Sequence, residues 1–210
     1  MIRLGLSAAV CALLSACGSG GPAPSAARCP QRMVLLNDHD ACMDRYEARI
    51  VVRNGRAEAV SASGTVPDIN LTYVEAEQAC RNVGYRLCTR AEWTRACAGP
   101  SGERKFPYGD TYVSHRCNIS EMEDPIESQH LAPGGQFSGC VTPEGISDLI
   151  GNALEWTDET PPQADQRELR GAMYSHPGPS AKCVRDERFF LVMTERSAGF
   201  RCCTDAAPAR

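Results

Sequence analysis

Cysteine content is the feature that most constrains how this chain folds. Twelve cysteines occur in 210 residues. Ten of them lie beyond the first 28 residues, namely Cys29, Cys42, Cys80, Cys88, Cys97, Cys117, Cys140, Cys183, Cys202 and Cys203. An even set in an exported chain predicts a disulfide framework. Zinc is the competing interpretation, but there is no C-x-x-C pair and adjacent cysteines are wrongly spaced for a ligand pair. The four histidines form no ligand motif either.

The N-terminal segment predicts export. Arg3 precedes an apolar run, residues 4–14, that is too short to cross a bilayer and is typical of a secretory signal. The run ends in Leu-Ser-Ala-Cys17, which resembles a bacterial lipobox, so we expect cleavage before Cys17 and lipidation of that residue. Gly18 then favours an outer-membrane lipoprotein of the cell envelope, facing the periplasm or the exterior. Ordinary secretion with an unmodified Cys17 is the alternative.

These signals divide the chain into four parts. We expect a signal peptide at 1–16, lipidated Cys17 and a flexible tether at 17–28, one folded domain at 29–204, and a tail at 205–210. A domain of this size buries roughly 70% of the surface that its unfolded chain exposes. Charge is mildly acidic and scattered, with 22 Lys and Arg against 26 Asp and Glu, so nucleic acid is not an expected partner.

Two capping boxes predict two helices. Thr72 with Glu75 begins the first, which runs to about residue 83, and Thr89 with Glu92 begins the second, which ends before Gly99. Cys80 and Cys97 lie late in these helices, where each can tie its helix to a sheet. We expect short strands at 33–36, 48–52, 168–173 and 199–203, and loop over most of 102–145. So long a loop region in a compact domain tends to carry function or to be held by ions and disulfides.

Five blocks in order resemble the formylglycine-generating enzyme, or sulfatase-modifying factor, family. They are CMDRYE at 42–47, GYRLCTRAEWTRACAG at 84–99, FPYGD at 106–110, DLIGNALEWTDE at 148–159 and GFRCC at 199–203. The resemblance covers about 29–204. It implies an α+β fold, the variant C-type-lectin-like fold of that family, which is loop-rich and held by disulfides and calcium.

The resemblance also implies particular disulfides. Carried over residue by residue, it pairs Cys80 with Cys202 and Cys97 with Cys183. The remaining six cysteines leave several pairings open. Sequence proximity, and the co-occurrence of RLCT with GFRCC, favour three pairs, which are Cys29 with Cys42, Cys117 with Cys140, and Cys88 with Cys203.

Two calcium sites are implied by the family pattern. Asp148, Gly151, Ala153 and Glu155 match the second site, with two carboxylates and two backbone carbonyls suited to a hard cation. The alternative is that Glu155 is a buried carboxylate bonded to loop amides. Asn118 and Ile119 fit the first site, whose further ligands have no match between Glu121 and Cys140.

The catalytic loop of the family has changed in this chain. Active members carry two cysteines, five residues apart, that bind Cu(I) and oxidise a substrate cysteine to formylglycine. The aligned positions here lie near His176 and Ala181, and neither is a thiol. Cys183 aligns instead with the structural partner of Cys97. We therefore expect calcium but no copper chemistry.

The sequence supports three functional hypotheses. The preferred one is an anchored, non-catalytic module that binds a protein or carbohydrate through the loops at 171–182 and 102–145, with Tyr174, His176 and Arg185 as candidate contacts. The second is an enzyme, either a sulfatase-modifying oxidase or another substrate-modifying member of the family. The third is a purely structural envelope lipoprotein.

Overall fold

The computed structural model describes residues 28–36, 40–121, 124–125, 129–158, 166–184, 188–190 and 197–207. Two predicted functional residues, Cys17 and Arg185, and the predicted signal and most of the tether lie outside these ranges. Within them, no helix is long and apolar enough to cross a membrane.

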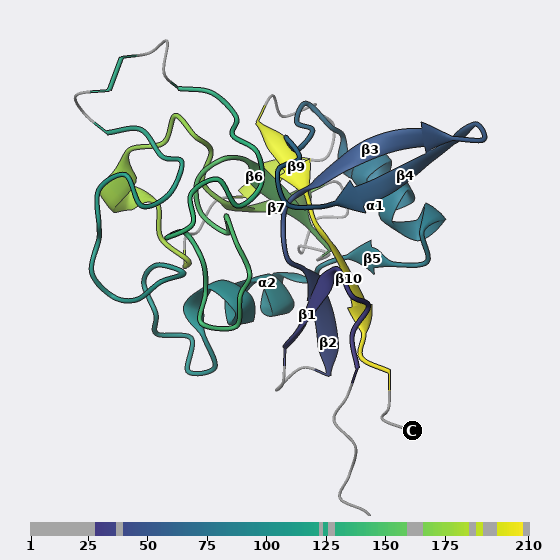
Figure 1. The fold of residues 1–210 in the computed structure, drawn as a ribbon, viewed down its shortest axis with the longest axis horizontal. Coiled ribbons are helices and arrows are strands. Elements are labelled where there is room, and N and C mark those ends of the chain that lie inside the picture. The colour runs from purple at the N-terminus through teal and green to yellow at the C-terminus, as the bar shows by residue number, and fades with distance from the viewer. Residues whose placement is uncertain are drawn as a thin grey trace, which may run out of the picture.

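Three small sheets and two helices form the ordered frame (Figure 1). The first sheet has the order β1 (Met33–Leu36), β2 (Ala41–Asp44), β10 (Cys202–Asp205), β5 (Arg86–Leu87). A hairpin joins β3 (Ala48–Arg53) to β4 (Arg56–Ser61). The third sheet has the order β8 (Arg188–Phe190), β7 (Gln166–Gly171), β6 (Leu154–Thr157), β9 (Ala198–Phe200), with β6 and β9 parallel.

Both predicted helices form, and both capping boxes are complete. In α1 (Tyr73–Asn82) the Thr72 side chain caps the helix with Glu75, and in α2 (Arg90–Ala98) Thr89 does so with Glu92. The reciprocal bonds satisfy backbone donors that a helix start otherwise leaves open. The inward faces bury Ala76 and Cys80 on α1, and Trp93 and Cys97 on α2, without solvent exposure.

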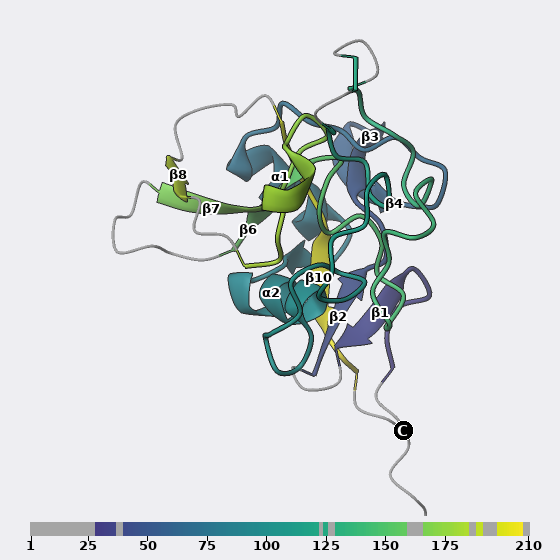
Figure 2. The ribbon, with the colours of Figure 1, turned by 90° about the vertical axis from the view of Figure 1, so that its left-hand side faces the viewer.

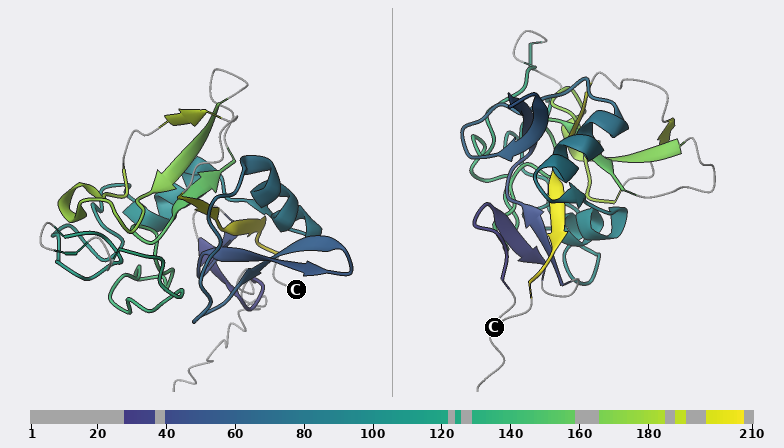
Figure 3. Two further views of the ribbon diagram at one scale, coloured as in Figure 1. Left: turned by 90° about the horizontal axis from the view of Figure 1, so that it is seen from above. Right: turned by 90° about the vertical axis from the view of Figure 1, so that its right-hand side faces the viewer.

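The long loop region gathers at one end of the molecule, and the β3–β4 hairpin projects from the other (Figures 1 and 3). The described residues of the loop region, between 102 and 145, form isolated bridges and turns but no regular strand or helix. Buried Phe106, Cys117, Ile119 and Cys140 belong to the same core cluster as the buried residues of α2. The loop region is therefore packed against the core, and Figure 2 shows the molecule from the side on which this region lies.

Strand predictions are correct in place but not always in extent. The strand at 33–36 is confirmed, and the strand at 48–52 extends to Arg53. The strand expected at 168–173 lies at 166–171 instead, because Gly171 adopts a positive φ of 91° and turns the chain. The strand expected at 199–203 is two strands, β9 and β10, separated at Arg201.

The two ends of the folded domain lie together. Arg28 and Ala207 exchange backbone hydrogen bonds of 3.1 Å, and β10 runs to Asp205. The described fold thus includes residues just outside the 29–204 limits expected from the sequence.

Candidate functional site

The described domain holds its ten cysteines in five disulfides. The pairs are Cys29–Cys42, Cys80–Cys202, Cys88–Cys203, Cys97–Cys183 and Cys117–Cys140. All five are those expected from the resemblance and from sequence proximity. A sulfur in a disulfide is neither a thiolate ligand nor a nucleophile. Cys183, the cysteine nearest the family's catalytic loop, is thus a structural residue in this structure.

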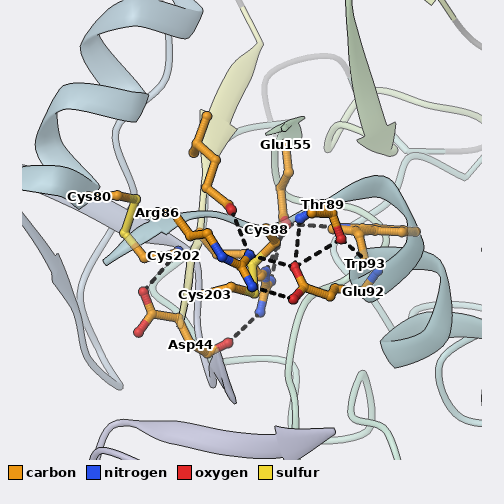
Figure 4. Close-up of a disulfide and its surroundings, with 12 residues drawn as sticks. Asp44, Cys80, Arg86, Cys88, Thr89, Glu92, Trp93, Glu155, Cys202 and Cys203 are labelled. Carbon is orange, nitrogen blue, oxygen red and sulfur yellow. Dashed lines mark hydrogen bonds and ion pairs between the residues drawn. A yellow bond between two sulfur atoms is a disulfide. The ribbon is translucent and has the colours of Figure 1, made fainter. Parts of the chain in front are cut away.

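Two of these disulfides hold β10 in place (Figure 4). Cys202 is bonded to α1 through Cys80, and Cys203 is bonded to Cys88, directly after β5. Beside them Arg86 makes a bidentate ion pair with Glu92, at 2.6 and 2.8 Å. Burial alone would raise the pKa of Glu92, but hydrogen bonds from Arg86 and the Thr89 backbone outweigh it and lower the pKa. This corner is fixed by covalent bonds and by an ion pair together.

A buried ion pair lies where β9 gives way to β10. Arg201 donates to both oxygens of Glu155 at 2.7 Å, and the Trp93 indole donates to the same carboxylate at 2.8 Å. The Arg201 guanidinium also donates to the carbonyls of Asp44 and Ser147. Arg201 and Glu155 are each 1% exposed, so their charges depend on each other for solvation.

Further carboxyl groups surround this pair. The Glu47 side chain accepts hydrogen bonds from Asn152 and from the Ala153 amide, and Asp148 accepts one from the Gly135 amide at 2.7 Å. Burial, reinforced by Asp148 and Glu155, raises the pKa of Glu47 well above its usual range. Burial also raises the pKa of Asp148, to about 6. Three carboxyl groups thus interact with the Arg201 guanidinium, and the buried set has an excess of acidic groups.

The structure brings together the residues of both predicted calcium sites. The Asn118 carbonyl accepts from the Asn152 amide at 2.8 Å, and a Cβ at Gly151 would overlap that carbonyl. Gly151, with a φ of 80°, is therefore required both by conformation and by space. Ile119 is buried and lies against Gly151. The two segments form one loop cluster and not two separate ones.

The fit of this cluster to calcium differs between its residues. The excess of buried acid suits a divalent cation, and Asp148 has one carboxylate oxygen that accepts no hydrogen bond within the described part. Glu155 instead already receives donors from Arg201 and Trp93 at both of its oxygens. Across the described ranges no group of three or more His, Cys, Asp and Glu side chains is placed to hold a metal ion. Asp148 fits the role better than Glu155 does.

The loop that follows β7 holds three residues singled out in the sequence, Tyr174, His176 and Ala181. The amide of half-buried Tyr174 donates to the Asn152 carbonyl, and His176 is also half-buried. His176 and Ser120 pair their backbones at 3.0 Å, and Gly178 donates to Ser120 at 3.0 Å. Ala181 is fully buried. The segment is therefore held against the long loop region through main-chain hydrogen bonds.

A pocket of about 650 Å3 lies between these two loops. Its lining comes from both, with Ser114, His115, Ser120, Glu121 and Asp124 on one side and Pro177, Gly178 and Pro179 on the other. Gly178 is needed there, because any Cβ would overlap the Tyr112 hydroxyl. A neighbouring pocket of about 440 Å3 shares Ser114 and His115 with it. We call the two together the loop pocket.

Charge in the loop pocket comes from two carboxylates, Glu121 and Asp124, in the larger part and from Arg116 in the smaller part. Glu121 accepts hydrogen bonds from the Tyr112 hydroxyl and from the His115 amide. Burial would raise the pKa of Glu121, but these bonds outweigh it and lower the pKa. Asp124 accepts from the Glu121 amide at 2.9 Å. Beside the Ser and His donors, these acceptors can form hydrogen bonds with hydroxyl or amide groups of a ligand.

Sequence reasoning did not single out several residues of these sites. Glu47 and Arg201 stood inside blocks quoted for the resemblance, so a buried charge at each could have been sought there. Ser114, His115 and Glu121 belong to irregular backbone, and His115 has a positive φ of 56°. No periodicity signals such residues. Both walls nevertheless lie within the two loops, 102–145 and 171–182, that the sequence predicted as a binding surface.

The fold defines a class: a loop-rich α+β domain of small sheets, two helices and five disulfides. The chain belongs to the family described as sulfatase-modifying factor enzyme 1-like domain, whose model matches residues 31–206.

Three known proteins show the range of this similarity. The chain is 27% identical over 169 residues to formylglycine-generating enzyme of Bos taurus, covering 68% of this chain and 45% of that protein. It is 30% identical over 117 residues to inactive C-alpha-formylglycine-generating enzyme 2 of Mus musculus, covering 52% and 38%. The chain thus spans less than half the length of either relative. The solved structure of Treponema denticola variable protein 1 shares the fold, with a TM-score of 0.57, 14% identity and coverage of 87% and 94%.

Proposed function

We propose that this protein is an exported, lipid-anchored member of the family that acts as a non-catalytic binding module for a protein or carbohydrate. The observation that carries this proposal is the Cys97–Cys183 disulfide, with a Cα separation of 5.3 Å. Together with His176 and Ala181 at the aligned catalytic positions, it leaves the described part of that loop without a thiol to bind Cu(I). One relative named inactive supports a family role that does not need the oxidase reaction.

The loop pocket is the proposed binding surface. Both of its walls are loops, and both are held on the packed core by hydrogen bonds and disulfides. Loops on a rigid scaffold are where recognition residues concentrate. Anchoring through Cys17 at the outer membrane would present this surface in the periplasm or at the cell exterior, where the disulfides are stable.

The binding test uses the purified full chain on arrays of immobilised oligosaccharides and peptides. We expect a ligand that binds the wild-type protein and binds Asp124→Asn more weakly. This change keeps the acceptor for the Glu121 amide but removes the charge of the side chain. Glu103→Gln, which removes a charge from an exposed residue outside the loop pocket, is the matched control. Equal weakening by both variants contradicts the proposed surface.

The enzymatic alternative has its own assay. The oxidised full chain is incubated with Cu(I), oxygen and a cysteine-containing peptide, and formylglycine is sought by mass spectrometry. We expect no conversion. Conversion by the protein with all its disulfides intact overturns the non-catalytic proposal, because it would need a reactive site other than paired thiols.

We also propose that calcium binds at the 148–155 loop, through Asp148 and the backbone carbonyls of Gly151 and Ala153, with Glu155 recruited only if Arg201 shifts. The excess of buried acidic groups supports it. Calcium at a hundred times its dissociation constant should raise the free energy of unfolding by about 2.7 kcal/mol. The gain should vanish in Asp148→Asn, measured by thermal unfolding in calcium and in chelator. An equal gain in both proteins places calcium elsewhere.

A further inference from the structure

A second pocket, unrelated to the catalytic loop, lies where the chain enters the first sheet and the β3–β4 hairpin. Its volume is about 550 Å3, and its lining includes Arg32, Arg45, Tyr46, Ser61 and Tyr85. We call it the arginine–tyrosine pocket. Its size is within the range of small-ligand sites. It shares no lining residue with the loop pocket.

One wall of this pocket is fixed by a neutralised arginine. Arg32 makes a bidentate ion pair with buried Asp44, at 2.6 and 2.7 Å, and donates to the Ala59 carbonyl at 3.0 Å. Its guanidinium lies 5.1 Å from the centre of the Tyr85 ring, over the ring face. With all three nitrogens engaged, Arg32 serves as support for Tyr85 and not as a free cation.

The opposite wall is equally constrained. The Tyr46 ring lies so close to Gly135 that a Cβ there would come within 2.8 Å of Tyr46 Cε1. The Ser61 hydroxyl donates to the Tyr46 carbonyl at 2.8 Å. Tyr46 and Tyr85 are both half-buried, and neither hydroxyl makes a hydrogen bond within the described part of the chain. Two oriented rings therefore line the pocket with their polar groups still available.

Arg45 supplies the charge of the pocket. Its Nη1 donates to the Gly145 carbonyl at 2.9 Å, which positions the side chain. No described carboxylate forms an ion pair with it, although Asp and Glu outnumber Lys and Arg by 26 to 22 in the whole chain. Arg45 is half-buried, its guanidinium is already positioned, and its other two guanidinium nitrogens make no hydrogen bond to the described residues, so it is suited to bidentate binding of a carboxylate.

From this arrangement we propose that the arginine–tyrosine pocket binds a carboxylate-bearing sugar. Arg45 would receive the carboxylate, the tyrosine rings would pack against the C–H face of the sugar, and their hydroxyls would bond to sugar hydroxyls. A fixed lining lowers the entropy lost on binding, so weak individual contacts suffice. An acidic peptide could supply the carboxylate but not a sugar ring that has an apolar C–H face and hydroxyls around it.

The test titrates the full chain with trigalacturonate, with the neutral galactose trisaccharide, and with a triglutamate peptide, using calorimetry. We expect saturable binding of trigalacturonate that added salt weakens. Arg45→Gln should weaken it about tenfold, the range expected for a lost charge-assisted hydrogen bond. Arg49→Gln, which removes an exposed arginine from the neighbouring strand β3, should leave it unchanged. Asp124→Asn in the loop pocket should also leave it unchanged, so this proposal and the loop-pocket proposal fail separately.

Several results would overturn the proposal. These are the absence of saturable binding, equal affinity for the neutral trisaccharide, tighter binding of triglutamate, or equal effects of Arg45→Gln and Arg49→Gln. Thermal unfolding establishes that each variant is folded. If Arg45→Gln does not fold, Tyr85→Phe replaces it, since that change removes one hydroxyl and should weaken binding a few-fold, whereas unchanged affinity contradicts the assignment.

Discussion

The buried ion pair of Arg201 with Glu155 and the loop pocket around Glu121 both contain carboxylates, but the carboxylates have different structural roles. Glu155 is 1% exposed and takes three nitrogen donors from Trp93 and Arg201. Glu121 lies in a pocket wall and takes its donors from a hydroxyl and from its own loop. The first arrangement joins strands that are distant in sequence. The second shapes a surface.

The residues of the sequence blocks that resemble the family lie mainly in the interior. The quoted blocks supply Glu47, Trp93, Glu155 and Arg201, which meet in the interior. The loops that build the pocket contain few of those residues. The interior therefore carries most of the family pattern, and the loop pocket lies largely outside it.

Breaking the buried pair should have the largest effect. Glu155→Gln removes the charge of the one carboxylate, within the described residues, to which the buried Arg201 guanidinium is hydrogen-bonded, which should cost about 3–5 kcal/mol in the free energy of unfolding. Urea unfolding measures it. The exposed pair of Glu77 and Arg81 is the matched control, where Glu77→Gln should cost about 0.5 kcal/mol or less. Similar losses of stability in Glu155→Gln and Glu77→Gln would contradict the stabilising role of the buried Arg201–Glu155 pair.

Removing the disulfide between Cys97 and Cys183 should have the second largest effect on stability. Cys97→Ala with Cys183→Ala should cost about 2–4 kcal/mol and should speed hydrogen exchange in residues 171–184. The Cys29–Cys42 pair spans 13 residues instead of 86, so its removal should cost less if chain entropy dominates. An equal or larger loss at Cys29–Cys42 argues against that reasoning.

Acid unfolding should distinguish a carboxylate in a structural ion pair, Glu92, from a carboxylate in the loop pocket, Glu121. Because the pKa of Glu92 is lowered in the folded state, its stabilisation is present above the unfolded pKa, about 4.3, and is lost as pH falls through the lower folded pKa. Glu92→Gln should therefore flatten the loss of stability on the acid side. The pKa of Glu121 is lowered too, but its site is more exposed, so Glu121→Gln should flatten it less. Stability against pH, followed by circular dichroism, checks the order.

Changes at the rim of the loop pocket should matter least for stability. Pro179 is exposed and lines the pocket, so Pro179→Ala should change the free energy of unfolding by about 0.5 kcal/mol or less. Thermal unfolding measures this. A cost as large as that of Glu155→Gln would mean that the pocket wall is part of the structural core.

Sequence patterns predicted the frame better than the surface. Capping boxes located both helices because a Thr and a Glu three residues apart satisfy local backbone donors. Strands β2, β4, β5, β6 and β8 were not among the expected ones. Strands β2 and β6 are buried throughout and lack alternation, and β5 and β8 have only two and three residues. The pocket walls depend on tertiary contacts such as Ser120 with Gly178, which no local pattern encodes.

The most direct test of the central claim is to map the cysteines of the purified domain. Alkylation without reduction, followed by digestion and mass spectrometry, shows which thiols are free. We predict that none of the ten cysteines from Cys29 to Cys203 is alkylated, and that two peptides joined by the Cys97–Cys183 disulfide are recovered. An alkylated Cys183 would contradict the non-catalytic proposal, because a free thiol at that position can bind Cu(I).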